Sequence, residues 1–150
     1  TNLLKPGGLM KIALYSELAR QHIAEVRKKI SLLRVGTSKS EIRKFRQSLA
    51  ESNEKNHQRL TKSNDFFNLS TLRDLIFHVQ EHRFSLPKIK NCLDELGLKF
   101  CGFENRDTIS NYRGFHGKDA DIYDLTQWHQ YEERNQYAFA EMYQFWCQKP

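Results

Sequence analysis

The stretch from Leu72 to Glu104, LRDLIFHVQEHRFSLPKIKNCLDELGLKFCGFE, constrains the fold most, because it places a helix stop, a helix start and a strand in unbroken succession. Ser85 is a good N-cap, and Pro87 falls in the first turn, where its missing N–H costs little. Gly97 then ends this helix. Leu98 to Phe103 alternates in a way that is typical of a strand. The residues of the capped helix that should face inward are Ile89, Cys92, Leu93 and Leu96. The chain must therefore combine helices with a sheet.

A second apolar stretch lies near the start of the chain. Lys5-Pro6-Gly7-Gly8 has turn chemistry, since proline fixes its φ and glycine tolerates positive φ. The run from Leu9 to Tyr15, LMKIALY, follows the turn and predicts a strand buried on both faces or nearly so. Ser16 is placed to cap a helix from Glu17 to about Leu33. Strands at about 9–15 and 98–104 thus predict an α+β, mostly helical fold with two strands.

The middle of the chain reads as helices joined by polar connections. Ser38 or Ser40 should cap a second helix, whose few apolar residues suggest that it covers the surface of something else. Asn64 to Asn68 reads as a loop, and Ser70 should cap a helix that runs to about Glu81. We expect a single domain or fragment with a turn and strand at 1–16, a helical insertion at 17–67, helices and a late strand at 68–104, and a loop with aromatic C-terminal helices at 105–150.

The C-terminal region is rich in aromatic residues. A polar loop is expected from Asn105 to Ile122, followed by one or two helices that begin near Asp124 and break around Asn135. The aromatic residues of this tail include Tyr123, Trp128, Tyr131, Phe139, Tyr143, Phe145 and Trp146. Such density buries much apolar area per residue, so the tail should pack as core rather than bind a cofactor.

The net charge of +6 is concentrated between Arg20 and Lys62, and the rest of the chain is closer to balance. A solvated helical face explains such a segment, and contact with a polyanion is the alternative. We therefore do not expect nucleic acid to be the partner.

The three cysteines form no C-x-x-C pair and lie in apolar patterns, which indicates reduced thiols in the cytoplasm. No apolar run approaches the roughly 20 residues of a membrane span, and no secretory leader is recognisable. We expect a cytoplasmic protein with no membrane partner. Because the chain starts with Thr1 in the middle of a pattern, we also expect it to be part of something longer.

Three stretches resemble one family of enzymes. Leu3-Leu4-Lys5-Pro6-Gly7-Gly8, followed by a hydrophobic strand, is similar to the turn before the fifth strand of class I S-adenosylmethionine-dependent methyltransferases. Phe84 to Phe103 resembles the last helix of that family and the strand after it, where the closing strand pair starts. GLMKIALYSELAR, LIFHVQEHRFSLP and FAEMYQFW, in this order, resemble the C-terminal part of bacterial methyltransferase domains often found in tetratricopeptide-repeat proteins. The resemblance implies a doubly wound, seven-stranded Rossmann-like sheet, to which this chain would contribute its last strands.

The chain departs from that family in its glycines. Class I enzymes hold S-adenosylmethionine with a glycine-rich loop after the first strand, and the seven glycines here include no G-x-G. The resemblance therefore implies that a cofactor-binding half precedes Thr1. S-adenosylmethionine would serve the full-length protein, whereas this chain alone would bind no cofactor and be inactive. Without the upstream strands, exposed strand edges would favour homo-oligomers. Neither the sequence nor the resemblance identifies the molecule that would accept the methyl group.

The end of the first predicted strand is the expected substrate side. Ligands of doubly wound sheets sit outside the carboxyl ends of the parallel strands. The resemblance therefore assigns Tyr15, Ser16 and Glu17, together with Phe84, to substrate binding. Tyr15 could hydrogen-bond an acceptor, and Glu17 could orient or deprotonate one. The plainer alternative is that these residues only end a strand and cap a helix.

His78, Glu81 and His82 form the pattern H-x-x-E-H. On a helix that reaches Glu81, the two histidines would share one face. In the methyltransferase interpretation these three are the catalytic candidates in the acceptor pocket, because imidazole titrates near neutrality and can remove a proton. The alternative is that they are surface residues at a helix end.

Two other functions remain open from the sequence. A class of zinc peptidases uses the same H-x-x-E-H pattern, with two histidines on the metal and the glutamate activating water. A third ligand of that zinc-dependent hydrolase would come from Glu104, Glu132, Glu133 or Glu141. The third possibility is a non-catalytic helical module, in which residues 17–67 bind a partner or act as a lid. We favour the methyltransferase interpretation, with no bound metal.

Overall fold

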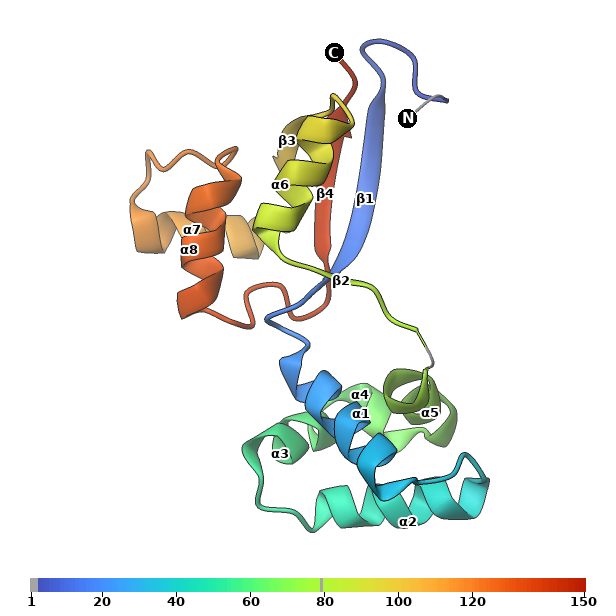
Figure 1. Ribbon diagram of the computed structural model, residues 1–150. Helices are drawn as coiled ribbons and strands as arrows, with labels where there is room; N and C mark the ends of the chain where they lie inside the picture. The colour runs from blue at the N-terminus through green and yellow to red at the C-terminus, as the bar shows by residue number, and fades with distance from the viewer. Residues whose placement is uncertain (1–2, 79) are drawn as a thin grey trace. The chain divides into compact units, whose positions relative to one another are not determined.

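The computed structural model of the chain describes residues 3–78 and 80–150 and divides into two compact units (Figure 1). The sheet unit comprises the chain up to Ala19 and from His82 onward, and the helical unit spans Arg20–Glu81. The fold is α+β and mostly helical, as predicted. Within the described ranges, no helix has the length and apolar character needed to cross a membrane.

The sheet unit is built on a mixed sheet with strand order β2-β1-β4-β3. Its strands are β1 (Leu9–Ser16), β2 (Arg83–Phe84), β3 (Lys99–Phe103) and β4 (Tyr143–Gln148). β1 pairs in parallel with β2, while β4 lies between β1 and β3 and is antiparallel to both (Figure 1). β1 and β3 therefore run in the same direction. The strands predicted at 9–15 and 98–104 are confirmed.

The turn before β1 forms as expected, because Gly7 adopts a positive φ of 77° and the Gly8 amide donates to the Lys5 carbonyl at 2.9 Å. The predicted burial of β1 on both faces is wrong. Along the strand, exposed residues such as Leu9 alternate with partly buried ones, because only the face that carries Met10, Ile12 and Leu14 packs against the core.

β4 corrects the prediction of helices up to the C-terminus. Tyr143, Phe145 and Cys147 are buried, and the residues between them are less so, which is the period of two expected for a strand with one covered face. The sequence YQFWCQ contains this alternation, but the surrounding aromatic residues suggested a helix.

Helix α6 (Leu86–Glu95) follows β2 and is formed as predicted. The Ser85 hydroxyl accepts a hydrogen bond from the Lys88 amide at 3.4 Å, and Gly97, at φ 62°, ends the helix. Leu86, Ile89 and Leu93 are buried. The inward orientation predicted for Leu96 is wrong, since its side chain is 53% exposed at the C-cap of the helix.

The segment predicted as a polar loop contains helix α7 (Arg106–His116). The Asn105 side chain caps it by accepting from the Thr108 amide at 3.0 Å. Thr108 and Tyr112, one turn apart, are the buried residues of the helix. So few apolar residues on an otherwise polar helix explain why the loop prediction failed.

Helix α8 (Leu125–Arg134) starts and ends near the predicted positions, with the Asp124 side chain as its cap. Its aromatic residues pack as core, as predicted: Trp128 is fully buried and stacks on Tyr112, with ring centroids 3.8 Å apart. The cluster that joins α6, α7, α8 and the sheet includes Leu93, Phe103, Tyr112, Trp128, Tyr131, Phe139, Tyr143 and Phe145. All three cysteines are free thiols, and only Cys147 is buried.

The helical unit has a core of its own. It consists of α1 (Gln21–Leu33), α2 (Lys39–Ala50), α3 (Lys55–Thr61), α4 (Asn64–Phe67) and α5 (Leu69–Phe77). The buried residues of its main cluster are Val26, Ile30, Phe45, Leu49, Leu60, Phe66, Leu72 and Ile76. The sparse apolar stripe of α2 therefore closes the core of this unit.

Three predictions within the helical unit are wrong, namely the start of its first helix, the loop at 64–68 and the cap of α5. α1 begins at Gln21 rather than at Glu17. The loop expected at 64–68 contains the short α4, and the Asn68 side chain, rather than Ser70, caps α5. Ser38, one of two expected caps, does cap α2 in a capping box with Glu41. The unit extends past the expected boundary at residue 67 because α5 contributes to its core.

Candidate functional site

The carboxyl ends of β1 and β2 meet at one edge of the sheet. In the parallel register Tyr15 lies opposite Arg83 and Ser16 opposite Phe84. Beyond the strand end, the Glu17 amide donates to the Phe84 carbonyl at 2.9 Å. The four residues assigned to substrate binding by resemblance are thus brought together. Tyr15 and Phe84 are partly buried, whereas Glu17 is exposed.

The third parallel strand ends at the same edge of the sheet. Because β3 runs in the direction of β1, its carboxyl end, followed by Glu104, lies on the side where β1 ends. The start of β4 is there too, since Tyr143 pairs with Leu14. We call this side of the sheet the carboxyl edge.

A pocket of about 400 Å³ opens at the carboxyl edge, between the end of β3, α7 and the segment before β4. Its lining residues are Phe103, Glu104, Asn105, Thr108, Tyr137, Ala138, Phe139, Ala140, Glu141, Met142 and Gln144. Sequence reasoning named Glu104 and Glu141 only as metal ligands by residue type. The useful signal was Glu104-Asn105 directly after a predicted strand, which is where ligands of parallel sheets bind.

A buried polar network holds the end of β1. The Ser16 hydroxyl donates to Glu132 Oε1 at 2.6 Å and accepts from the Ala19 amide at 3.0 Å. The Tyr143 hydroxyl lies 2.7 Å from both carboxylate oxygens of Glu132. Ser16, Glu132 and Tyr143 are each fully buried. The network therefore ties β1, β4 and α8 together directly behind the carboxyl edge.

The electrostatics of this network follow from its burial. Desolvation raises the pKa of Glu132, and the hydrogen bonds from Ser16 and Tyr143 oppose the rise. Desolvation and the adjacent carboxylate also raise the pKa of the Tyr143 phenol. Tyr143 thus stays a hydrogen-bond donor over the whole neutral range. The Ser16 hydroxyl accepts from the Ala19 amide, as its predicted capping role required, but the residues after it form a turn and the helix begins only at Gln21.

Phe84 and its neighbours add a cationic side to the edge. Lys88 Nζ lies 4.8 Å from the centroid of the Phe84 ring, which is within the range of a cation–π contact. His82 belongs to the sheet unit and immediately precedes β2. Phe84 thus lies at the carboxyl edge with Lys88 beside its ring, a neighbour that sequence reasoning missed, and His82 is the exposed residue before β2.

The helix expected to carry H-x-x-E-H ends before the motif. α5 stops at Phe77, and His78 has the extended backbone angles φ −62° and ψ 130°. The predicted continuation of this helix to Glu81 is wrong, and its predicted stripe residue Val79 lies outside the described residues. The shared helical face of His78 and His82 is therefore absent. The structure assigns His78 to the helical unit and His82 to the sheet unit.

Glu81 is occupied by two arginines of its own unit. Arg20 donates to it through Nε at 3.0 Å and through Nη2 at 2.7 Å, and Arg27 Nη2 donates at 3.0 Å. Burial alone would raise the pKa of Glu81, but the two guanidinium groups outweigh it and lower the pKa. A carboxylate held in this way is a weak proton acceptor, so its position favours a role in holding the helical unit together.

The described ranges contain no group of three or more His, Cys, Asp or Glu residues arranged to hold a metal ion. A scan against protein-family models found no match, and a search of curated proteins found none either. The arrangement that remains is a sheet edge with a pocket, an exposed carboxylate at Glu17, and a rigid hydrogen-bonded support beneath it. Such an edge can bind and orient a small group presented to it.

Proposed function

We propose that this chain is the acceptor-side, C-terminal portion of a class I S-adenosylmethionine-dependent methyltransferase. The observation that carries the proposal is the sheet order, in which β1, β2 and β3 run in parallel and β4 is inserted antiparallel between β1 and β3. β3 and β4 thus form a strand pair that finishes the sheet on one side. This agrees with the resemblance, in which the chain supplies the fifth strand and part of the closing pair.

The opposite side of the sheet is open, which supports a missing upstream half. β2 pairs only with Tyr15 and Ser16, so in the described part of the chain Leu9–Leu14 has no ladder partner on that side. Unpaired strand edges are ready to add another strand. We propose that the cofactor-binding half, encoded before residue 1, adds its parallel strands here and brings S-adenosylmethionine to the carboxyl edge.

The roles of the edge residues follow from transfer chemistry. Methyl transfer from a sulfonium needs an acceptor held in line and, for oxygen or nitrogen acceptors, a group that takes a proton. Tyr15, Phe84 and the pocket beside Glu104 would hold the acceptor. Glu17 or His82 would take the proton. Glu132 would act through Ser16 by fixing the backbone that carries these groups.

The test is a transfer assay with the longer protein. This chain, joined to the segment encoded upstream, should transfer radiolabelled methyl groups from S-adenosylmethionine to a component of an extract of the source cells. Deleting residues 82–150 should abolish transfer, because the acceptor side is removed. Full transfer by the upstream segment alone would refute the proposed role.

A further inference from the structure

We propose that one face of helix α7 holds a binding site for a small ligand that joins a phosphate group to an apolar group. The site is a surface pocket of about 510 Å³, which is within the size range of small-ligand pockets. Its lining residues are Arg106, Ile109, Ser110, Arg113, Gly114 and Lys118. We call it the α7 pocket. It shares no lining residue with the pocket at the carboxyl edge, so the proposal does not depend on the methyltransferase function.

The sequence of α7 places most of the lining on one side of the helix. Arg106, Ser110 and Arg113 are separated by four and three residues, which is the spacing of neighbours on one helical face. The other side of the helix is fixed to the core, because Tyr112 is fully buried and stacks on Trp128 with ring centroids 3.8 Å apart. The α7 pocket therefore lies on a helix that is held in one orientation.

Three cations line the α7 pocket, and no acid does. Arg106, Arg113 and Lys118 make no ion pair within the described ranges. Asp107 and Asp119 each follow one of these cations in the chain, but neither lines the pocket. With both acids counted, three cations against two acids leave residues 106–119 with a net charge of +1. The pocket therefore favours an anionic ligand.

Arg106 occupies a position of α7 where a cation is unfavourable. It is the first residue of the helix and lies beside the positive end of the helix dipole. Arg113 is in the last turn, where the dipole favours a cation. Helix stability thus explains Arg113 but does not explain Arg106. A bound anion would offset the unfavourable interaction, because it would be attracted both by Arg106 and by the positive end of the helix.

Gly114 and Ile109 provide the apolar part of the α7 pocket. A glycine inside a helix is less stable than alanine, and a Cβ added to Gly114 would meet no atom within 4 Å. Gly114 is also not among the glycines with positive φ, so neither packing nor backbone conformation requires glycine there. Ile109 is partly buried against the core. An apolar group of the ligand would lie against Ile109 in the space that Gly114 leaves open.

The lining fits a phosphate group better than a carboxylate. A carboxylate has one charge and two oxygens, which the fork of a single arginine satisfies. A phosphate monoester has close to two charges at neutral pH and three strong acceptor oxygens. Two guanidinium groups, one ammonium group and the exposed Ser110 hydroxyl supply the donors that these oxygens need. The donor set therefore indicates a phosphate ester.

A nucleic acid fits the α7 pocket less well than a small phosphate ester. Binding to a phosphate backbone takes a stripe of cations along one face of a protein. The sheet unit has 11 Lys and Arg residues against 11 Asp and Glu residues, so its net charge is zero. The three cations of the pocket are thus a local group, which one phosphate group is enough to engage.

The experiment is an NMR titration of the full chain labelled with nitrogen-15. The probes are phenyl phosphate, inorganic phosphate, benzoate and a single-stranded RNA. Phenyl phosphate should shift the amide signals of residues 106–118 in a saturable way. It should bind more tightly than inorganic phosphate, which lacks the apolar group, and more tightly than benzoate, which lacks the phosphate. Arg106→Gln with Arg113→Gln should weaken phenyl phosphate binding about tenfold or more.

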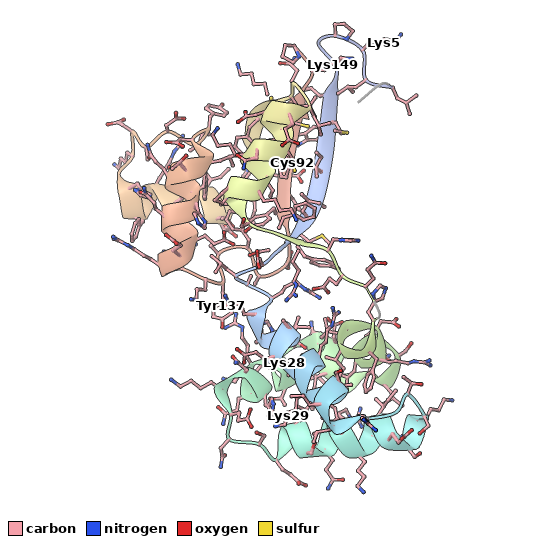
Figure 2. The ribbon with its side chains drawn as sticks, in the orientation of Figure 1. Lys5, Lys28, Lys29, Cys92, Tyr137 and Lys149 are labelled. Carbon is pink, nitrogen blue, oxygen red and sulfur yellow. The ribbon has the colours of Figure 1, made fainter. Side chains whose placement is uncertain are left out.

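Gly114→Leu separates binding from stability. Leucine favours a helix more than glycine does, so the melting temperature should be retained or raised, whereas the filled pocket should bind phenyl phosphate more weakly. A matched pair of charge removals is Lys118→Gln, which should weaken binding, and Lys5→Gln, which should not. Figure 2 shows Lys5 in the turn before β1, apart from α7.

The absence of a saturable shift in α7 with phenyl phosphate would overturn the proposal. Equal binding by the wild type and the Arg106/Arg113 variant would overturn it too, because the donors of the α7 pocket would then have no role. Benzoate that binds as tightly as phenyl phosphate would contradict the assignment to phosphate. RNA that shifts α7 when phenyl phosphate does not would assign this face to a nucleic acid instead.

Discussion

Arg20 and Glu81 stand at the two ends of the helical unit and are joined by two hydrogen bonds of 3.0 and 2.7 Å. Both side chains are about nine-tenths buried. Arg20 is the first residue of the helical unit and Glu81 is the last, so this ion pair joins the two ends of the unit. Glu81, the glutamate of H-x-x-E-H, is thus engaged by arginines of the helical unit.

Replacing Glu81 should destabilise the helical unit, because it leaves Arg20 and Arg27 without their buried counter-charge. We expect Glu81→Ala to lower the free energy of unfolding of this unit by about 3 kcal/mol or more. Amide hydrogen exchange of α1 and α5 in the full chain would measure it. Asp74→Asn, an exposed acid of α5, is the control and should change protection little. Unchanged exchange in Glu81→Ala would contradict the role of the pair.

The same pair predicts a pH dependence. The folded pKa of Glu81 lies below its ordinary value of 4.5, so the folded state binds this proton less readily than the unfolded state. The stabilisation is therefore complete above about pH 4.5 and is lost as the pH falls through the lowered pKa. Hydrogen exchange of α1 between neutral and acidic pH should show this loss. In Glu81→Gln the dependence should be weaker, and an identical pH profile would exclude Glu81 as its source.

Glu132 should make the stability of the sheet unit depend on pH with the opposite sign. Burial raises its pKa, so the folded state binds the proton more readily, and stability falls as the pH rises from 4.5 through the raised pKa. Unfolding by urea, followed by the fluorescence of buried Trp128, would report it. Glu132→Gln should remove this decline while keeping a hydrogen-bond acceptor for Ser16. Stability that rises over the same interval would contradict the assignment.

Removing the Glu132 carboxylate, which is the hydrogen-bond acceptor of the network, should lower the free energy of unfolding of the sheet unit. Glu132→Ala leaves the buried hydroxyls of Ser16 and Tyr143 without their shared partner, and we expect a loss of about 2–3 kcal/mol or more. The same fluorescence measurement applies, with Glu133→Ala as the exposed neighbour on α8 for comparison. An equal loss of unfolding free energy in Glu132→Ala and Glu133→Ala would contradict the supporting role of the network at the carboxyl edge.

Several elements could be predicted from the sequence because one local signal decided each of them. Ser85, Pro87 and Gly97 mark α6 by capping chemistry alone, and the apolar run after Gly8 marks β1. β4 could not be recognised, since its alternation is six residues long and lies among aromatic residues that also suit a helix. Its place between β1 and β3 depends on pairing across the whole chain.

The candidate site could be predicted only in part, because some of its residues are brought together by long-range contacts. The resemblance assigned Tyr15, Ser16, Glu17 and Phe84, and the local pattern located the end of β1, whereas the strand β2 that carries Phe84 was not predicted. Glu132 is 116 residues from Ser16, so only the folded chain brings these two together. The helix predicted through H-x-x-E-H is wrong, because α5 ends at Phe77, one residue before His78. Long-range pairing and helix ends are therefore the limits of the sequence argument.

The most direct measurement of the central claim is calorimetric titration with S-adenosylmethionine. We predict that this chain alone gives no binding heat, because it contains no G-x-G loop, and that the chain joined to its upstream segment binds the cofactor. Micromolar binding by this chain alone would contradict the account. A joined protein that is folded but does not bind S-adenosylmethionine would contradict it as well.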